Sequence, residues 1–303
     1  MTEQNNAQVI IIGGGPAGVS AALYLARAGV RTTIIENGPG ALARAHKIDN
    51  YYGITASGAR LYAAGLEQAE ALGVSIRQDE VLSVEYTDSF TLSLKTTAEQ
   101  LSAPALILAT GTKNITLNLP GLVQLEGKGI SYCAVCDGFF FRKKQVAVLG
   151  SGAYALHEAA YLRHLAQSVT ILTNGQSGEA AQNVGFDVKE AKLVQLNGDS
   201  RLTSISFDDG STLEVDGLFI AMGTADSTDI ARKLGAQTNG RFIKIDADGK
   251  TNIPGLFAAG DCTGGLLQVS KAVHEGAQAG LAALNFIRNK QVFKRTTRSD
   301  ILC

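Results

Sequence analysis

Two of the four cysteines in this chain of 303 residues lie in the segment YCAVCDG, as Cys133 and Cys136, with two residues between them. A structural zinc site would need four ligands in paired motifs, but Cys262 and Cys303 are isolated and the four histidines form no such pair. A structural disulfide across so short a loop would add little stability. The spacing is most typical of a redox couple, because cysteines in this arrangement ionise and exchange readily.

An aspartate follows the second cysteine directly. The carboxylate of Asp137 is placed to move a proton during thiol–disulfide exchange. The alternative is a solvated acid in the turn before Gly138, and spacing alone does not separate these two interpretations. We predict that Cys133, Cys136 and Asp137 are catalytic, and we predict no metal site.

The elements around this segment form an internal repeat. Residues 9–36 and 146–173 each read as a short apolar strand, a glycine-rich turn, an alanine-rich helix and a second apolar strand. The segments ALILATGT at 105–112 and GLFIAMGT at 217–224 form a second matching pair. Two such units in register indicate an α/β fold with two Rossmann-like dinucleotide-binding domains, the second and smaller one inserted into the first. We expect residues 1–116 and 246–303 to form the first domain and residues 117–245 the second.

The first glycine-rich turn, GGGPAG, has every feature of a nucleotide site. Gly13 permits the tight turn, Gly15 lets the backbone approach a pyrophosphate, and Gly18 lets the helix pack close to the strand. The helix N-terminus then presents its N–H groups to the phosphates. Glu36 ends the second strand, where its carboxylate can accept hydrogen bonds from ribose hydroxyls. Glycines used for packing alone are the less favoured alternative.

The second turn, GSGAYA, is not equivalent. Ala155 takes the third glycine position, and the bulk of Tyr154 is expected to obstruct a pyrophosphate. Thr173 replaces the acidic residue, and the following NGQSGE contains no Arg or Lys to meet a 2′-phosphate. We predict a weakened nucleotide site in this domain.

Composition limits the class of protein. The chain is 45% hydrophobic and 18% charged, with a formal net charge of −1. These values are ordinary for a soluble globular protein and indicate neither a nucleic-acid nor a membrane partner. The polar N-terminus MTEQNNAQ lacks the pattern of a signal peptide. Four cysteines are too few for a disulfide scaffold, so we expect a cytoplasmic location.

The whole chain resembles the low-molecular-weight thioredoxin reductases, flavoproteins with two dinucleotide-type domains. The matching motifs are GGGPAG at 13–18, Glu36, IDN at 48–50, ATG at 109–111, CAVCDG at 133–138 and AGD at 259–261. The resemblance implies FAD in the first domain, a CxxC that passes electrons to a protein disulfide, and a homodimer. The cofactor-binding residues expected for FAD are Gly13, Gly15, Pro16, Ala17, Gly18, Glu36, Asn50, Thr110, Gly111, Gly260, Asp261 and Gln268.

The resemblance also implies a role for each residue of the CxxC motif. Cys136 would face the flavin and form the transient flavin adduct, Cys133 would attack the disulfide of a thioredoxin-like partner, and Asp137 would act as acid and base. Cys262 is expected to pack as a small residue in the first domain.

Three segments depart from the common pattern of this family. The second turn is GSGAYA without a basic cluster after it, residues 43–53 read ARAHKIDNYYG, and DCTGGLLQ at 261–268 lacks the usual arginine before the glutamine. These features resemble the branch that works without pyridine nucleotides, which includes ferredoxin-dependent flavin thioredoxin reductases and diflavin-linked disulfide oxidoreductases.

The sequence therefore predicts an FAD-dependent dithiol–disulfide oxidoreductase that reduces a thioredoxin-like protein with electrons from ferredoxin or another flavin. The alternatives are an NADPH-dependent thioredoxin reductase with a divergent nucleotide site, an FAD-dependent dithiol oxidase, and a flavin-bound redox sensor without turnover.

Overall fold

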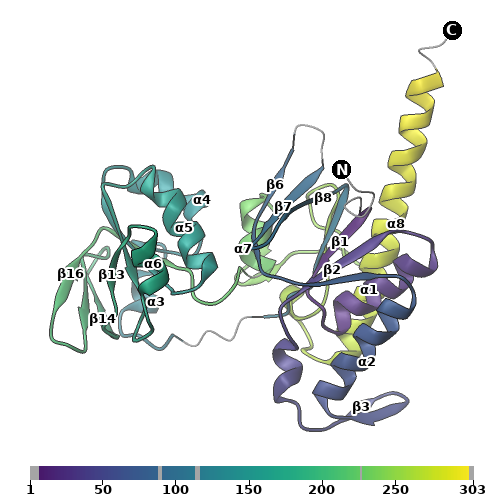
Figure 1. Ribbon diagram of the computed structural model, residues 1–303, viewed down its shortest axis with the longest axis horizontal. Helices are drawn as coiled ribbons and strands as arrows, with labels where there is room; N and C mark the ends of the chain where they lie inside the picture. The colour runs from purple at the N-terminus through teal and green to yellow at the C-terminus, as the bar shows by residue number, and fades with distance from the viewer. Residues whose placement is uncertain (1–6, 88–90, 113–116, 226, 300–303) are drawn as a thin grey trace. The chain divides into compact units, whose positions relative to one another are not determined.

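A computed structural model describes residues 7–87, 91–112, 117–225 and 227–299, without the side chains of 291–299 (Figure 1). The chain divides into two compact units. The first unit is Met1–Lys113 with Asp226–Cys303, and the second is Asn114–Ala225. The second unit is thus a continuous segment between two parts of the first.

The second crossing between the units lies earlier than the expected 245/246 boundary. Residues 226–245 belong to the first unit. They contain α7 (Ser227–Lys233), which packs against β6 and β19, and the short strands β18 (Thr238–Asn239) and β19 (Phe242–Ile243). The turn-forming residues at 246–255 are typical of a linker and led to the later boundary, but the buried side chains of α7 hold the preceding segment in the first unit.

A five-stranded parallel sheet forms the centre of the first unit, in the order β20-β9-β1-β2-β5. Its central strands are apolar runs that are buried on both faces, as expected for a parallel sheet covered on each side. The strands are β20 (Leu256–Ala258), β9 (Ala105–Leu108), β1 (Val9–Ile12), β2 (Thr32–Glu36) and β5 (Ser75–Gln78).

Helix α1 (Pro16–Arg27) packs against the long α8 (Val269–Ser299), as Figure 1 shows. The two helix backbones lie so close together that a Cβ at Gly276 would be 2.1 Å from the carbonyl oxygen of Ala17. Glycine at this position therefore permits the packing. The remaining elements are α2 (Gly58–Ala71), the turns η2 (Gly40–Arg44) and η4 (Asp261–Thr263), the hairpin β3 (Ile48–Tyr51) and β4 (Ile54–Ala56), and the antiparallel sheet β6 (Val81–Tyr86), β7 (Leu92–Thr96) and β8 (Gln100–Ala103).

The second unit repeats this plan with a parallel sheet in the order β10-β17-β11-β12-β13. Its parallel strands are β10 (Ile130–Ser131), β17 (Gly217–Ile220), β11 (Gln145–Leu149), β12 (Ser168–Leu172) and β13 (Asp187–Lys189). Its helical elements are α3 (Leu122–Leu125), α4 (Ala134–Asp137), η3 (Gly138–Phe141), α5 (Ala153–Arg163) and α6 (Glu179–Asn183). An antiparallel sheet of β14 (Leu193–Asn197), β15 (Ser204–Phe207) and β16 (Thr212–Glu214) completes it.

The predicted fold class is confirmed. The order β9-β1-β2-β5 in the first unit matches β17-β11-β12-β13 in the second, and each glycine-rich turn joins the central strand to the following helix. Among the residues described above, no helix has both the length and the hydropathy that a membrane span requires.

Candidate functional site

The first glycine-rich turn has the geometry that the sequence predicts. Gly13 has a φ of 112°, and a Cβ there would lie 2.3 Å from the carbonyl oxygen of Ala109. A Cβ at Gly18 would lie 1.9 Å from the carbonyl oxygen of Gly13, so the helix packs directly on the turn. A Cβ at Gly15 would meet nothing within 4 Å. Only Gly15 therefore leaves open space where a ligand can approach the backbone.

A pocket of about 340 Å³ lies over this turn in the first unit. It brings together most of the predicted cofactor-binding residues, namely Gly13, Gly15, Pro16, Ala17, Asn50, Thr110, Gly111, Gly260, Asp261 and Gln268. Apolar residues that were not predicted as cofactor contacts complete the wall, among them Pro39, Leu42, Ile48, Leu267 and Ala272. Apart from Ile48, which begins the IDN motif, they lie outside the matching motifs, because they come from separate segments of the chain.

Gly18 and Glu36 do not belong to this lining. Glu36 ends β2 and is 8% exposed. Its Oε2 accepts a hydrogen bond from the Gly38 backbone N–H at 2.7 Å and another from the Tyr62 hydroxyl. Burial, together with this hydrogen bond, raises the pKa of Tyr62 above its usual range. The contact between Glu36 and a ribose stays a prediction. The sequence did not identify Tyr62 as the residue that binds the Glu36 carboxylate.

Thr110 lines the pocket and also anchors α7. Its Oγ1 lies 2.8 Å from Ser227 Oγ and accepts a hydrogen bond from the Ser227 backbone N–H at 2.9 Å. Ser227 is fully buried. The sequence predicted Thr110 as a cofactor contact but not this structural bond.

Two further predicted residues meet at the pocket. Asn50 Nδ2 donates to Gln268 Oε1 at 2.9 Å, which brings together residues 218 positions apart in the chain.

The pKa of the half-buried Asp261 is raised above its usual value, mainly by burial. The positive charge of Lys271 lowers this pKa, and the negative charge of Glu275 raises it. Cys262 is buried at 1% exposure, which raises the pKa of its thiol to about 12. The prediction that Cys262 packs as a small residue is confirmed, while Cys303 lies outside the described residues.

The residues of the pocket fit a dinucleotide cofactor. Helix α1 has Gly15 as its N-cap and Pro16 at its first position, and no side chain caps its N-terminal N–H groups. Those groups and the open side of Gly15 suit a pyrophosphate. The apolar wall suits aromatic rings, and the Asp261 carboxylate is an acceptor for hydroxyl groups.

The second unit contains the redox motif as a disulfide between Cys133 and Cys136, with Cα atoms 5.3 Å apart. Cys133 is the N-cap of α4, and its Sγ accepts the Cys136 backbone N–H at 3.2 Å. Cys133 is 4% exposed, whereas Cys136 is exposed. The sulfur that the family resemblance assigns to attack on a partner is therefore the buried one in this oxidised form.

Asp137 is held beside the disulfide by Ser131. The Ser131 hydroxyl donates to Asp137 Oδ2 at 2.6 Å, and its Oγ accepts the Cys133 backbone N–H at 3.1 Å. This arrangement ties the carboxylate to the loop that carries Cys133. The sequence predicted Asp137 but not Ser131.

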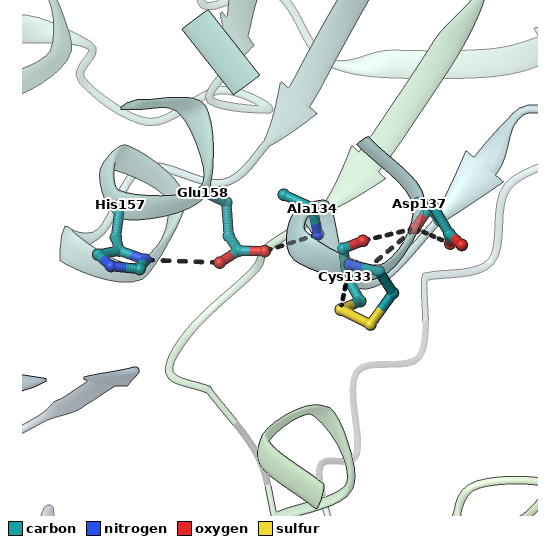
Figure 2. Close-up of a disulfide and its surroundings, with 7 residues drawn as sticks. Cys133, Ala134, Asp137, His157 and Glu158 are labelled. Atoms are coloured by element: carbon teal, nitrogen blue, oxygen red, sulfur yellow. Dashed lines mark hydrogen bonds and ion pairs between the residues drawn. A yellow bond between two sulfur atoms is a disulfide. The ribbon is translucent and has the colours of Figure 1, made fainter. Parts of the chain in front are cut away.

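Near the disulfide lies a buried carboxylate that the sequence did not single out. Glu158, on α5, is 2% exposed, and its Oε2 accepts the Ala134 backbone N–H at 2.9 Å (Figure 2). Its Oε1 lies 3.5 Å from His157 Nδ1. Glu158 therefore connects α5 to the first residue of α4, directly after Cys133. Only the packing of α4 on α5 reveals this role.

One reason for predicting a weak second nucleotide site is wrong. Tyr154 is fully buried, so its ring lies in the interior and does not obstruct the turn. The backbone of the N-cap Gly152, with φ −88° and ψ 179°, is close to that of Gly15. The second turn itself is therefore preserved.

The loop after β12 is what differs. The Ser151 hydroxyl donates to the Gln176 side chain, which links the glycine-rich turn to this loop. Thr173 Oγ1 donates to the Gln176 carbonyl oxygen at 2.5 Å, and Glu190 Oε1 accepts the Gly178 backbone N–H at 2.7 Å. Hydrogen bonds within the unit thus occupy the polar groups at the position where Glu36 stands in the first unit.

Arg163 and Lys192 are two cations that could substitute for the missing basic cluster. Arg163 donates to the carbonyl oxygens of Val184 and Gly185, and its guanidinium lies 3.7 Å from the centroid of the Phe186 ring. Lys192 packs against Gly175, where a Cβ would lie 2.9 Å from its Cε. Arg163 is therefore engaged elsewhere, while Lys192 places one exposed cation beside the loop.

Comparison with known proteins defines the class. Residues 7–276 match the family described as pyridine nucleotide-disulphide oxidoreductase, and the chain belongs to this family. A thioredoxin reductase of Listeria monocytogenes is 33% identical over 306 residues, which covers 94% of this chain and 95% of that protein.

Two solved structures are similar over nearly the whole chain. The crystal structure of an atypical thioredoxin reductase from Desulfovibrio vulgaris Hildenborough is 42% identical with a TM-score of 0.88, and the match covers 94% of this chain and 99% of that one. A ferredoxin-flavin thioredoxin reductase from Clostridium acetobutylicum is 28% identical with a TM-score of 0.68, covering 95% and 99%. The chain is a thioredoxin reductase-type flavin disulfide oxidoreductase, and its cofactor is FAD.

Proposed function

We propose that the chain reduces the disulfide of a thioredoxin-like protein through Cys133 and Cys136, with electrons from a donor other than NADPH. The observation that carries the redox part of this proposal is the disulfide between these residues, which is exposed at Cys136 and lies beside the carboxylate of Asp137. FAD, when bound, supplies the two electrons that reduce the disulfide to a dithiol.

The exchange with the partner takes two steps. The Cys133 thiolate attacks one sulfur of the partner disulfide, a mixed disulfide forms, and the other partner sulfur leaves as a thiolate. The Cys136 thiolate then attacks Cys133 Sγ, the mixed disulfide breaks, and the second partner thiolate leaves. Two electrons have passed to the partner, which takes up two protons, and the Cys133–Cys136 disulfide is restored.

The side chains around the motif support these steps. The Cys136 N–H that donates to Cys133 Sγ would stabilise a thiolate at Cys133. Asp137, oriented by Ser131, would pass protons to the leaving thiolates. Because Cys133 is 4% exposed in the disulfide form, its attack requires the α4 loop to open on reduction.

The surroundings of Cys136 favour a protein as the partner. Val135, Phe139 and Phe140 are 44%, 65% and 69% exposed, and Arg142 lies over the Phe139 ring at 5.5 Å. Exposed apolar side chains gathered beside a reactive sulfur are typical of a protein-binding surface. A thioredoxin-like protein would cover them while its disulfide reaches the motif.

The loop after β12 argues against NADPH as the donor. It has Thr173 where ribose recognition uses an acid, and no Arg or Lys within residues 174–179. Each missing charge-assisted hydrogen bond to a 2′-phosphate is worth about 1.5–3 kcal/mol. Two such losses weaken binding by roughly a hundredfold or more. A ferredoxin or another flavin is the proposed donor, and the name of the similar Clostridium acetobutylicum structure, a ferredoxin-flavin thioredoxin reductase, supports the first of these.

An anaerobic stopped-flow experiment tests the choice of donor. The holoenzyme is mixed with NADPH, with NADH or with reduced ferredoxin, and flavin bleaching is followed. Fast bleaching by reduced ferredoxin alone is the expected result. Rapid, saturable bleaching by micromolar NADPH would instead identify an NADPH-dependent thioredoxin reductase, with Lys192 as the first residue to test for phosphate binding.

Two further outcomes separate the remaining alternatives. Oxygen consumption with a dithiol substrate, faster than disulfide reduction, would identify a dithiol oxidase. Flavin reduction without any turnover of a thioredoxin would identify a sensor. We also propose a cytoplasmic homodimer, for which light scattering should give twice the 31.7 kDa chain mass.

A further inference from the structure

A lysine in the first turn of α8 is bound to the loop that follows β20. Lys271 Nζ donates to the carbonyl oxygens of Gly260 at 2.9 Å and Gly264 at 2.5 Å, and to Thr263 Oγ1 at 2.8 Å. It also forms an ion pair with Glu275 Oε2 at 3.0 Å, one helical turn further on. The two side chains are only 15% and 20% exposed.

Glu275 completes the network from the same helix. Its Oε2 accepts the Gly260 backbone N–H at 2.9 Å and lies 2.8 Å from the Thr263 hydroxyl oxygen. Both backbone polar groups of Gly260 are therefore hydrogen-bonded. Its N–H donates to Glu275, and its C=O accepts from Lys271. Gly260 has φ 86° and ψ −153°, a conformation that essentially only glycine adopts, so the turn depends on such support.

The turn at residues 260–264, which Lys271 and Glu275 hold, forms part of the pocket that fits FAD. Gly260 and Asp261 line the pocket, whereas Lys271 and Glu275 do not belong to its lining. The pair acts on the Asp261 carboxylate with opposite signs, since Lys271 lowers its pKa and Glu275 raises it. A cation near a helix N-terminus is also unfavourable toward the helix dipole. The helix dipole therefore does not explain a lysine at position 271, whereas its hydrogen bonds to residues 260–264 do.

We propose that Lys271 and Glu275 are a positioning pair that holds residues 260–264 in shape for FAD and keeps the charge beside the flavin balanced. Neither residue is catalytic, since each acts through the turn. The pair as a whole is neutral. Loss of one member therefore has two consequences, a looser turn and an uncompensated charge of the opposite sign.

The two single variants should shift the flavin potential in opposite directions. Glu275→Gln keeps an oxygen for the Gly260 N–H but leaves the Lys271 ammonium uncompensated, which stabilises the more negative reduced flavin and raises the midpoint potential. Lys271→Met leaves the Glu275 carboxylate uncompensated and lowers the potential. The double variant should return near the wild-type value. A purely structural role would not produce this reversal of sign.

Flavin release supplies a second readout. Holoenzymes are diluted, and the fluorescence of free FAD is followed with time. Lys271→Met should release FAD about tenfold faster or more, since it removes three hydrogen bonds from a charged donor. The matched control is Lys250→Met in the same unit, where an exposed ion pair with Asp248 is lost. The control should release FAD at the wild-type rate.

Circular dichroism verifies that each variant is folded, and the isosteric Glu275→Gln keeps the test open should Lys271→Met fold poorly. Opposite shifts in potential together with faster release from Lys271→Met would support the proposal. Shifts of the same sign in both single variants, or wild-type potential in Glu275→Gln, would overturn it.

Discussion

The helices α1 and α5 are the same element of a repeated fold, yet each unit uses its helix differently. In the first unit the N-terminus of α1 meets the pocket through Gly15, Pro16 and Ala17. In the second unit α5 acts from its second turn, where Glu158 accepts a hydrogen bond from the backbone N–H of Ala134, the residue directly after Cys133. The glycine turns differ little between the units. The side chains that surround each turn differ, and the proposed division between a cofactor site and a support for the redox motif rests on them.

The strand that follows each helix shows the same divergence. At the end of β2, Glu36 presents a carboxylate that accepts hydrogen bonds from Gly38 and Tyr62. At the end of β12, Thr173 presents a hydroxyl that donates to Gln176. A charged group that can only accept has been replaced by a neutral hydroxyl whose proton is already engaged. Because a nucleotide ribose donates through its hydroxyls, the carboxylate is the stronger partner for it.

The largest effect should come from the redox motif of the second unit. Replacing Cys133 or Cys136 by serine is expected to reduce thioredoxin turnover to background, because each sulfur is the attacking group in one of the two exchange steps. Cys136→Ser should accumulate a mixed disulfide between Cys133 and the partner, detectable by non-reducing electrophoresis and mass spectrometry. Cys303→Ser, a cysteine to which no role is assigned, is the control. Accumulation in Cys133→Ser instead would exchange the roles of the two sulfurs.

Matched changes in the two glycine turns test the comparison directly. Gly15→Val places a side chain in the open space over the first turn, and FAD affinity should fall about a hundredfold or more, as expected when two contacts to phosphate are lost. Gly152→Val makes the same change at the N-cap of α5. It should leave FAD binding and turnover with reduced ferredoxin intact. Loss of turnover in Gly152→Val, measured with FAD fully bound, would show that the second turn is still in use.

A smaller effect is expected at the strand ends. Glu36→Ala removes the proposed ribose acceptor, and the dissociation constant of FAD should rise about tenfold or more. Thr173→Ala, the equivalent change in the second unit, should not alter it. Titration of deflavinated protein with FAD, followed by fluorescence quenching, measures both. Equal effects of the two variants would contradict the division of roles between the units.

The smallest effect should appear at Glu158. Glu158→Gln keeps an oxygen for the Ala134 N–H but loses its charge, so the hydrogen bond should weaken by about 0.5–1.5 kcal/mol. Hydrogen exchange of the 131–138 segment should then accelerate roughly two- to tenfold. Glu214→Gln, an exposed acid on β16, serves as the control. Unchanged exchange would mean that Glu158 does not hold the CxxC loop.

The parts predicted best from the sequence are those governed by local geometry. The repeat of strand, glycine turn and helix placed both sheets and both turns, because a strand with apolar residues on both faces and a turn that requires glycine leave clear sequence patterns. The pair Cys133 and Cys136 was evident from spacing, and the disulfide joins the same residues. The boundary near residue 226 was missed, because α7 belongs to the first unit through packing rather than through any motif.

The direction in which a side chain points was harder to predict from the sequence. The sequence placed Tyr154 in the glycine turn and predicted an obstruction, yet the side chain is fully buried. One residue along a helix rotates a side chain by about 100°, so a position beside a turn does not establish which way the side chain points.

The sequence by itself determined the class of fold, the glycine turn that suits a pyrophosphate and the cysteine pair that suits redox exchange. These follow from backbone conformation and from spacing within a few residues. Only the tertiary structure decided which distant groups support them. Ser227 meets Thr110 across 117 positions, and Lys271 and Glu275 meet Gly260 across a turn and a helix start. Such contacts arise when buried polar groups must find partners in the folded chain, and no local pattern records them.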